Sequence, residues 1–365
     1  MRRQEVEAAV GWAEREGWNP GVSDAEAFYA ADPEGFFIAE LDGAPVGSVS
    51  VVNYSEAFAF AGLYILRPEY RNRGYGSRLF AAGMAHAGNR NIGGDGVLAM
   101  LEKYRTRSGF SLAYRNIRFE GTGGGNEPEG PVDIAAVPFE PLAAYDARHF
   151  PAPRPRFLAA WIRQEGTRGR AVLTEDGEIA GYGVIRRCHH GNKIGPLFAD
   201  TPDVAEDIFL ALSAQVPGEP VYIDTPEPNA AAVALARRQG MVPVFETARI
   251  YTKAVPDLPL DEIFGVLEGL AQMDERASLV TFARLSVAMI REDEEGTRAF
   301  RRICAAVLDT RPPAEGERSN AELILPVAAD LFEDGAVGEA ICVTDTLLHG
   351  CAGGERPACP HLAVP

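Results

Sequence analysis

Residues 63–79 have the sequence LYILRPEYRNRGYGSRL, and this stretch decides how the chain is interpreted. The apolar run over 57–66 is typical of a strand, and the composition of 77–87 is that of a helix. The loop between them has the pattern Arg-x-x-Gly-x-Gly. Such a loop can point successive backbone N–H groups at one anion, which the following helix dipole also attracts. The pattern therefore indicates a pyrophosphate nest, although glycines beside basic residues also form ordinary turns.

The residues of this loop have separate tasks under that interpretation. Gly74 and Gly76 permit a positive φ or a close backbone approach. Arg71 and Arg73 add positive charge beside the nest.

Hydrophobic periodicity and turn residues predict the other elements of the first 120 residues. Asp42-Gly43 between two strand-like runs is a strong hairpin signal. The Gly-rich segment 121–131, with its Pro and Glu residues, predicts a linker. The remaining predictions are helices over 5–16 and 23–31 and strands over 36–41, 46–53, 97–101 and 110–119.

Two features of the first half recur in the second half. Asp42-Gly43 returns as Asp176-Gly177 at an offset of 134 residues, and Gly109 returns as Gly240 at an offset of 131 residues. Nearly equal offsets in the same local patterns favour a duplicated fold over chance.

The stretch over 63–79 closely resembles the central motif of the GNAT superfamily of N-acetyltransferases. The resemblance implies that the strand splays from its neighbour and that its backbone pairs with the pantetheine arm of acetyl-CoA, which Tyr64, Ile65 and Leu66 would face. It also implies a glycine loop that wraps the pyrophosphate of the cofactor. The residues that would hold the pyrophosphate are Arg71, Asn72, Arg73, Gly74, Tyr75, Gly76 and Ser77.

A second hallmark of this family is an Asn-x-x-Ala-x-x-Leu helix that ends in Gly-Phe or Gly-Met. It is present over 229–241, whereas the first half keeps only Tyr104 and Gly109-Phe110. Segments such as 94–97, 195–200 and 263–266 resemble the tandem, YitH-like branch of the family. The implied fold is α/β (α+β), with two lobes that each contain a mixed, mostly antiparallel sheet flanked by helices. We predict a first lobe over 1–122, a linker over 123–131, a second, degenerate lobe over 132–266 and a helical extension over 267–365.

Acetyl transfer requires a neutral amine, stabilisation of the tetrahedral oxyanion and a proton for the departing thiolate. Many members of the family use a Tyr shortly before the Gly-Phe pair as the acid, and Tyr104 is the candidate here. It lies one residue further from Gly109 than usual, Arg105 takes the expected place, and a packing role for Tyr104 remains the alternative. No general base is assigned, although Glu56, Asp95 and Glu102 lie near the right elements, because acidic residues near turns are usually solvated.

The second half lacks the glycine loop. Its predicted strand over 193–199 runs into Asp200-Thr201-Pro202-Asp203, which offers no glycine for a nest and places carboxylates where a pyrophosphate needs positive potential. Asp203 and Glu206 suit the first turn of an ordinary helix. We therefore predict one acetyl-CoA site per chain, in the first lobe. The cleft left free in the second lobe could contribute to an acceptor pocket where the lobes meet.

The function that these observations favour is acetyl transfer from acetyl-CoA to the amine of a small molecule or an aminoacyl compound. The alternative is a non-catalytic acyl-CoA sensor or interaction protein. Apolar residues at helical spacing in the extension, among them Leu279, Phe282, Leu285 and Met289, predict helices that pack on the lobes, on a second subunit or on a protein partner.

Composition limits the other function classes. The chain has 365 residues, a net charge of -17 and no long apolar run, which argues against a nucleic-acid binder and against a membrane role. The negative charge favours a cationic substrate no more than it favours simple solubility. Five dispersed cysteines and a start without an export signal predict a cytoplasmic protein with reduced thiols. Neither Cys188 with His189 and His190 nor the Cys and His residues over 349–361 have the spacing of a standard zinc site, and we predict no metal.

Overall fold

The computed structural model of the chain describes residues 1–71 and 73–267, all of which belong to one compact unit, Met1–Met273. Apart from Leu267, the helical extension predicted over 267–365 lies outside the described residues. The same holds for the cysteines and histidines after residue 349.

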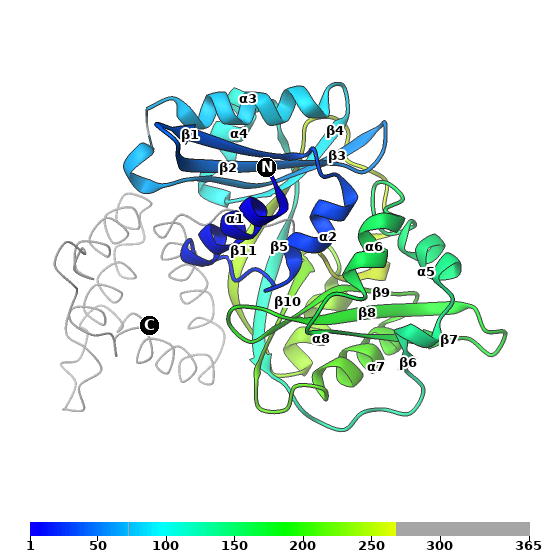
Figure 1. The fold of residues 1–365 in the computed structure, drawn as a ribbon. Helices are drawn as coiled ribbons and strands as arrows, with labels where there is room; N and C mark the ends of the chain where they lie inside the picture. Colours follow the sequence, from blue (N-terminus) through cyan, green and yellow to red (C-terminus); the bar gives the residue numbers. More distant parts are fainter. Residues whose placement is uncertain (72, 268–365) are drawn as a thin grey trace, which may run out of the picture. The chain divides into compact units, whose positions relative to one another are not determined.

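Twelve strands of the described residues form a single mixed sheet, with the order β1-β2-β3-β4-β11-β5-β10-β9-β8-β7-β6 and with β12 beside β9 (Figure 1). The first half of the chain contributes β1 (Phe36–Leu41), β2 (Ala44–Asn53), β3 (Phe58–Leu66), β4 (Asn91–Gly96) and β5 (Ser111–Thr122). The second half contributes β6 (Val132–Asp133), β7 (Thr167–Leu173), β8 (Ile179–Arg187), β9 (Asn192–Ala199), β10 (Pro220–Pro226), β11 (Val242–Tyr251) and β12 (Ile263–Gly265). Only the pairs β3–β4 and β9–β10 are parallel among the pairings of these strands. The expected mixed, mostly antiparallel sheet is confirmed.

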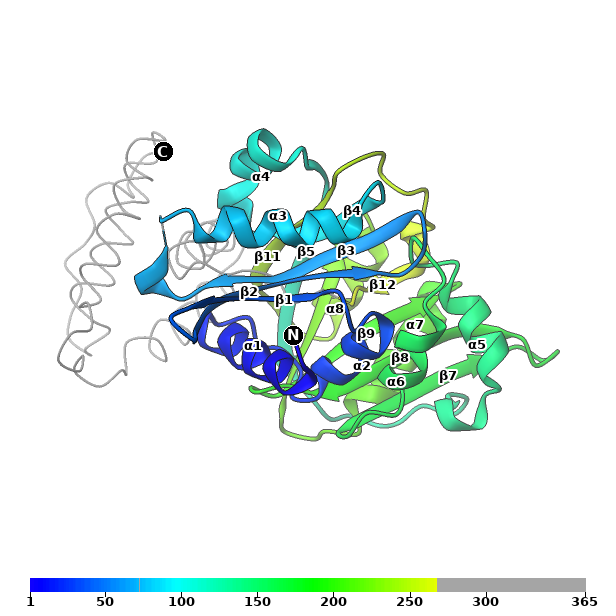
Figure 2. The same ribbon diagram turned by 45° about the horizontal axis from the view of Figure 1, so that its top comes forward.

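Helices cover both faces of this sheet. In the first half, α1 and α2 lie on one face of β1–β3 and α3 lies on the other (Figure 2). The helices are α1 (Arg3–Arg15), α2 (Asp24–Ala31), α3 (Tyr75–Ala87), α4 (Leu101–Ser108), α5 (Phe139–Asp146), α6 (Pro155–Trp161), α7 (Pro202–Ser213) and α8 (Ala230–Arg238). Short 3-10 turns are η1 (Pro68–Tyr70), η2 (Leu98–Met100), η3 (Ile134–Ala136) and η4 (Leu260–Glu262). The predicted helices over 5–16, 23–31 and 77–87 and the hairpin at Asp42-Gly43 are confirmed.

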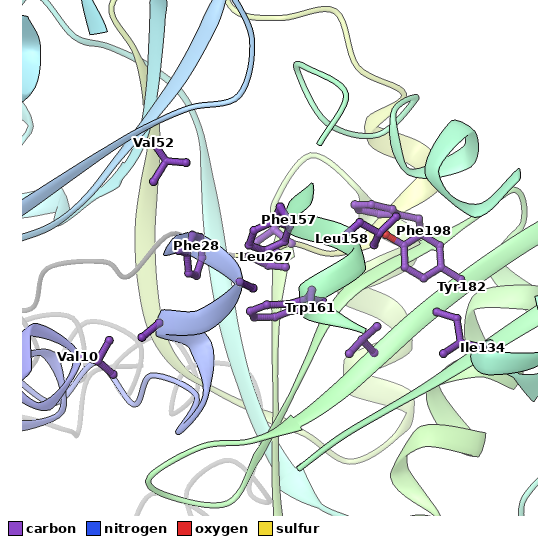
Figure 3. Close-up of a cluster of buried hydrophobic side chains, with 14 of the residues drawn as sticks. Val10, Phe28, Val52, Ile134, Phe157, Leu158, Trp161, Tyr182, Phe198 and Leu267 are labelled. Atoms are coloured by element: carbon purple, nitrogen blue, oxygen red, sulfur yellow. The ribbon is translucent and has the colours of Figure 1, made fainter. Parts of the chain in front are cut away.

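One hydrophobic core runs from the first half into the second. It includes Val10 and Phe28 from α1 and α2, Trp161 from α6 and Tyr182 from β8, all of them buried (Figure 3). Phe157 and Trp161 are stacked, with ring centroids 5.2 Å apart. Because the two halves share this core, we expect them to unfold together.

The strand predicted over 97–101 is wrong. The strand in this region is β4, Asn91–Gly96, and it is followed by η2 and then by α4. The sequence of β4, NIGGDG, does not look like a strand because glycine has no side chain to pack. Here aromatic rings take that space, since a Cβ on Gly93 would lie 3.0 Å from both Phe58 and Tyr251.

The two halves exchange one strand each, β5 and β11. β11 of the second half lies between β4 and β5 of the first, and β5 of the first half lies between β11 and β10 of the second. At the centre of the β5–β11 ladder Asn116 stands opposite Thr247, and these residues are 131 positions apart, as are Gly109 and Gly240. The duplication is therefore visible in the sheet as an approximate twofold relation.

Each exchanged strand carries an arginine that pairs with an aspartate of the other half. Arg249 on β11 donates from Nε to Oδ1 of Asp95 at 2.6 Å and from Nη2 to Oδ2 at 3.0 Å. Arg118 on β5 donates to Asp224 on β10 in the same way, at 2.6 and 2.9 Å. All four residues are buried. These bidentate pairs fix the register of the exchange.

We predict that Asp224→Asn lowers the free energy of unfolding by roughly 3–5 kcal/mol, because it leaves Arg118 and Lys193 buried without their shared counter-charge. Chemical denaturation followed by fluorescence and by circular dichroism should give one transition for both halves. Glu227→Gln is the control, because it removes a half-exposed partner of Arg115 and should cost about 1 kcal/mol or less. Two separate transitions, with only the second half weakened, would contradict the shared core.

Candidate active site

An open cleft separates β3 from β4. The two strands pair from Phe58 opposite Asn91 to Ala61 opposite Gly94 and then diverge. Beyond this point β4 stays paired with β11, where Gly96 stands opposite Ala248. The segment 62–66 of β3 pairs with β2 alone among the described strands. Its second edge therefore offers main-chain groups to a ligand.

A β-bulge shapes this part of β3. Ser48 stands opposite Ile65 and Ser50 opposite Gly62, so Leu63 and Tyr64 together face Val49. Leu63 has a φ of 47°, which is uncommon for a residue with a side chain. Its carbonyl oxygen accepts a hydrogen bond from Oγ of Ser48 at 2.9 Å. Backbone strain of this kind often marks a functional segment.

Alternation along β3 separates the three residues that were expected to face the pantetheine. Tyr64 and Leu66 pack on the α3 side, against the cluster that contains Phe80. The side chain of Ile65 lies in the core on the other side of the sheet, with Val6 and Val10. The side chain of Ile65 therefore points away from the cleft, and its main chain is the part that could meet a ligand there.

The cleft forms a pocket with an empty volume of about 430 Å³, part of it open to solvent. Its polar side chains are those of Tyr64, Asp95 and Tyr104. The apolar lining consists of Val49, Ala61, Phe80, Phe110 and Ile250. Ile250 comes from β11, so the second half of the chain supplies part of the wall.

The glycine loop leads directly into α3. Gly74 is the N-cap residue, with a φ of 83° that favours glycine, and no side chain caps this helix end. Gly74 is exposed, and a Cβ placed on it would meet nothing within 4 Å. Tyr75, Gly76 and Ser77 form the first turn of α3. Asn72 lies outside the described residues.

The two arginines of the loop have different surroundings. Arg71 donates from Nη2 to Glu16 at 2.5 Å and from Nε to the carbonyl oxygen of Leu66 at 2.8 Å. Glu16 thus offsets its charge, and Arg71 ties the loop to α1. Arg73 is exposed and lies 6.0 Å from the ring centroid of Tyr70. Arg73 therefore supplies more of the available positive charge than Arg71.

Tyr104 on α4 lines the inner part of the cleft. Its ring packs so closely on β4 that a Cβ on Gly96 would lie 2.6 Å from it. Burial raises the pKa of Tyr104 to about 12, against an opposing hydrogen bond with the backbone of Val97. Arg105, at the usual spacing, is exposed. The unusual spacing thus still brings a tyrosine to the cleft.

The acidic candidates for a general base have different surroundings. Glu56 is exposed in the turn between β2 and β3. Asp95 is buried, and both of its carboxylate oxygens accept from Arg249. Burial is the main reason that the pKa of Asp95 is raised, and Arg249 opposes this shift. The side chain of Glu102 is not described. We assign no base among them.

In the second half, α7 begins directly where the first half has its glycine loop. Oγ1 of Thr201 caps this helix by accepting from the amide of Val204, and Asp203 lies in its first turn. Glu206 pairs with Arg238 on α8. The cleft between β9 and β10 holds β12, so the expectation of a free cleft that contributes to an acceptor pocket is wrong.

Cys188, His189 and His190 have separate partners. Nδ1 of His189 lies 3.1 Å from Glu14, whereas the ring of His190 lies near Tyr222. Cys188 is buried, with its sulfur 3.9 Å from the carbonyl oxygen of Arg186.

Across the described residues, no helix is both long and apolar enough to cross a membrane.

Two residues that line the cleft, Phe80 and Ile250, were not predicted as site residues, and Phe110 was noted only as part of the Gly-Phe pair. Phe80 follows the helical pattern of core residues, which carries no functional signal. Arg249, which holds Asp95 of the cleft in place, was not predicted either. The sequence does contain a signal for Arg249, because this residue stands 131 positions after Arg118, which is the offset between Gly109 and Gly240. Applying that offset along the chain would have identified the two arginines as equivalent.

Comparisons with known proteins agree with this geometry. A family model described as "Acetyltransferase (GNAT) family" matches residues 4–104, and one described as "Acetyltransferase (GNAT) domain" matches residues 142–265. Holothin acyltransferase from Pseudoalteromonas sp. is 34% identical over 248 residues, which cover 67% of this chain and 84% of that protein.

Two solved structures are also similar to this chain. A proposed acetyltransferase from Pyrococcus horikoshii is 26% identical with a TM-score of 0.63, and the match covers 74% of this chain and 94% of that one. A tandem GNAT protein from the clavulanic acid biosynthesis pathway is 14% identical with a TM-score of 0.49, over 69% and 96% of the two chains. The chain belongs to the GNAT family of acyltransferases and contains two GNAT domains in tandem.

Proposed function

We propose that this protein is an N-acetyltransferase that binds acetyl-CoA in the cleft between β3 and β4 and transfers the acetyl group to the amine of a small molecule or an aminoacyl compound. The observation that carries the proposal is that the start of α3, directly after the glycine loop, adjoins this cleft, because a Cβ on Gly76 would lie 2.5 Å from the hydroxyl oxygen of Tyr64 in its lining. The free edge of β3, a helix end without a side-chain cap and the half-buried Tyr104 thus lie around one cleft.

The pantetheine arm carries amide groups, which suit the free main-chain edge of residues 62–66. An extended ligand there would add to the sheet as a strand does. Tyr64 and Leu66 would contact it from the α3 side, and Phe80 and Phe110 would line its apolar part. A bound arm would also satisfy the backbone groups that the divergence of β3 and β4 leaves without strand partners.

The pyrophosphate would lie at the start of α3. The amides of Tyr75, Gly76 and Ser77 have no side-chain cap, and the helix dipole makes this end positive. Arg73 and Asn72 would add contacts from the loop, whereas Arg71 would hold the loop against α1. The amides at the start of α3 and the charge of Arg73 would together bind the pyrophosphate anion.

The chemistry needs no covalent enzyme intermediate. The amine nitrogen attacks the thioester carbon, a C–N bond forms, the C–S bond breaks, and the electron pair leaves on sulfur. Tyr104 keeps its proton at neutral pH and passes it to the departing thiolate. The proton that the amine nitrogen loses returns to Tyr104 through solvent, so that the step balances.

Thiol release from acetyl-CoA in the presence of a library of amines tests the activity. The proposal expects steady release with at least one amine, well above the rate of hydrolysis. Acetyl-CoA binding with no turnover on any amine would instead favour the acyl-CoA sensor. The family and the relative named for acyl transfer support the catalytic alternative.

We predict that wild-type protein binds one acetyl-CoA per chain and that Gly74→Glu abolishes this binding without unfolding the protein. The substitution puts a carboxylate near the place where phosphate oxygens should lie. A Cβ on Gly74 would meet nothing within 4 Å, so the variant should fold. Calorimetric titration measures the number of acetyl-CoA sites per chain in the wild type and the loss of binding in Gly74→Glu.

Gly177→Glu is the matched control, because Gly177 has a φ of 81° and equally open surroundings in the second half. It carries the same backbone strain and the same added charge, and it should leave the affinity unchanged. Equal affinities for wild type and Gly74→Glu would rule out the loop as the pyrophosphate site.

We predict that Tyr104→Phe lowers kcat by roughly 10²-fold or more and changes the Kd of acetyl-CoA by less than about threefold, as expected for a lost proton donor. Tyr222→Phe is the control, since Tyr222 is a buried tyrosine of β10 that bonds Glu120. An unaltered kcat in Tyr104→Phe would show that Tyr104 is a packing residue and not the acid.

The pH dependence follows from the raised pKa of Tyr104. An acid with a pKa of about 12 stays protonated up to about pH 11, whereas the acceptor amine loses its proton as the pH rises. We therefore expect kcat/KM to rise or to level off between about pH 7 and about pH 10. A fall centred near pH 10 that disappears in Tyr104→Phe would show that Tyr104 ionises earlier than its burial implies.

A further inference from the structure

The second half of the chain has a cleft equivalent to the one between β3 and β4. β9 and β10 are parallel and pair from Val221 opposite Asn192 to Ile223 opposite Ile194. They then diverge, as β3 and β4 do after Ala61 and Gly94. In this second cleft, the space between the strands is filled by β12 of the same chain.

β12 lies in the cleft as an extended strand that bonds to both walls. Ile263 stands opposite Phe198 and Gly265 opposite Leu197, so β12 pairs with the part of β9 that has left β10. On the other wall, the amide of Val266 donates to the carbonyl oxygen of Asp224 on β10 at 2.8 Å. The cleft is therefore closed by main-chain hydrogen bonds on both sides.

The side chains of this segment are buried on both faces of the sheet. Phe264 is fully buried in the cluster formed by α7 and α8, and Ile263 and Val266 are buried in the core on the opposite face. The fit is tight, because a Cβ on Gly195 would lie 2.8 Å from the carbonyl oxygen of Val266. No space remains there for a second extended chain.

Asn229 connects β12 to α8. Its Nδ2 donates to the carbonyl oxygens of Asp261 and Ile263, at 3.1 and 3.0 Å. Its Oδ1 accepts from the amide of Ala232 at 3.0 Å and so caps α8. One buried side chain thus holds both the helix and the strand, and these two tasks use different atoms.

We propose that β12 is the resident ligand of the second cleft, and that it occupies the place that the pantetheine arm takes in the first cleft. The comparison with pantetheine rests on the proposed function of the first cleft. An extended backbone with amide groups on both edges is the ligand class that such a cleft accepts. The second half is closed to acyl-CoA by this strand, independently of its missing glycine loop, and Asn229 is the residue that positions the strand.

Two substitutions separate the tasks of Asn229. Asn229→Asp and Asn229→Ser both keep an oxygen that can cap α8, and both lose the amide donors to β12. We expect amide hydrogen exchange at Val266 to become about tenfold faster or more, while Ala232 remains protected. If the Asp variant does not fold, the uncharged Ser variant carries the same test. Unchanged exchange at Val266 in a folded variant would overturn the proposal.

Titration with acetyl-CoA distinguishes this proposal from the proposed function. Wild type and both Asn229 variants should bind one acetyl-CoA per chain with equal affinity, and Gly74→Glu should bind none while Val266 stays protected. Two comparable sites in wild type would overturn the closure of the second cleft. An absence of binding in wild type, with the exchange result intact, would refute the function of the first cleft but not the position of β12.

Discussion

The exchange of β5 and β11 is the constraint on which the rest of the structure depends. Each strand completes the sheet of the other half, and each carries a buried arginine in a bidentate pair with an aspartate, Arg249 with Asp95 and Arg118 with Asp224. A buried carboxylate or guanidinium that loses its partner is costly. Neither half can therefore shift its register or separate without exposing these charges or leaving them unpaired, which is why we expect the two lobes to unfold together.

This arrangement allows β4 to leave β3. A strand that diverges from its neighbour loses main-chain hydrogen bonds on that side, but β11 holds β4 from its other edge up to Gly96. The first cleft can thus stay open as far as Tyr104 and Ile250. The second half meets the same difficulty between β9 and β10, and there the chain fills the gap with β12. One duplicated fold consequently contains an open cleft and a closed one.

The sequence predicted the parts of this fold that depend on local signals. The hairpin at Asp42-Gly43, the strand before the glycine loop and the helix α3 follow from turn residues and periodicity. The sequence did not predict β4, because its glycines make room for aromatic rings from distant strands. It did not predict the exchange of β5 and β11 either, because strand pairing is not local. For the candidate site, the motif predicted the loop and Tyr104, and these assignments stay predictions. Alternation along the strand indicates in addition that the side chains of Tyr64 and Ile65 point to opposite faces of the sheet. The ion pair of Arg71 with Glu16 could not be predicted from the sequence, because it depends on the tertiary structure.

We propose that the first cleft, and not the second, binds acyl-CoA. A crystal structure of the protein with a non-hydrolysable acetyl-CoA analogue is the decisive measurement. We expect one analogue per chain, with its pantetheine arm along residues 62–66, its pyrophosphate at the amides of Tyr75, Gly76 and Ser77, and its sulfur position within hydrogen-bonding reach of the Tyr104 hydroxyl. An analogue bound between β9 and β10 with β12 displaced, or bound away from the glycine loop, would contradict it.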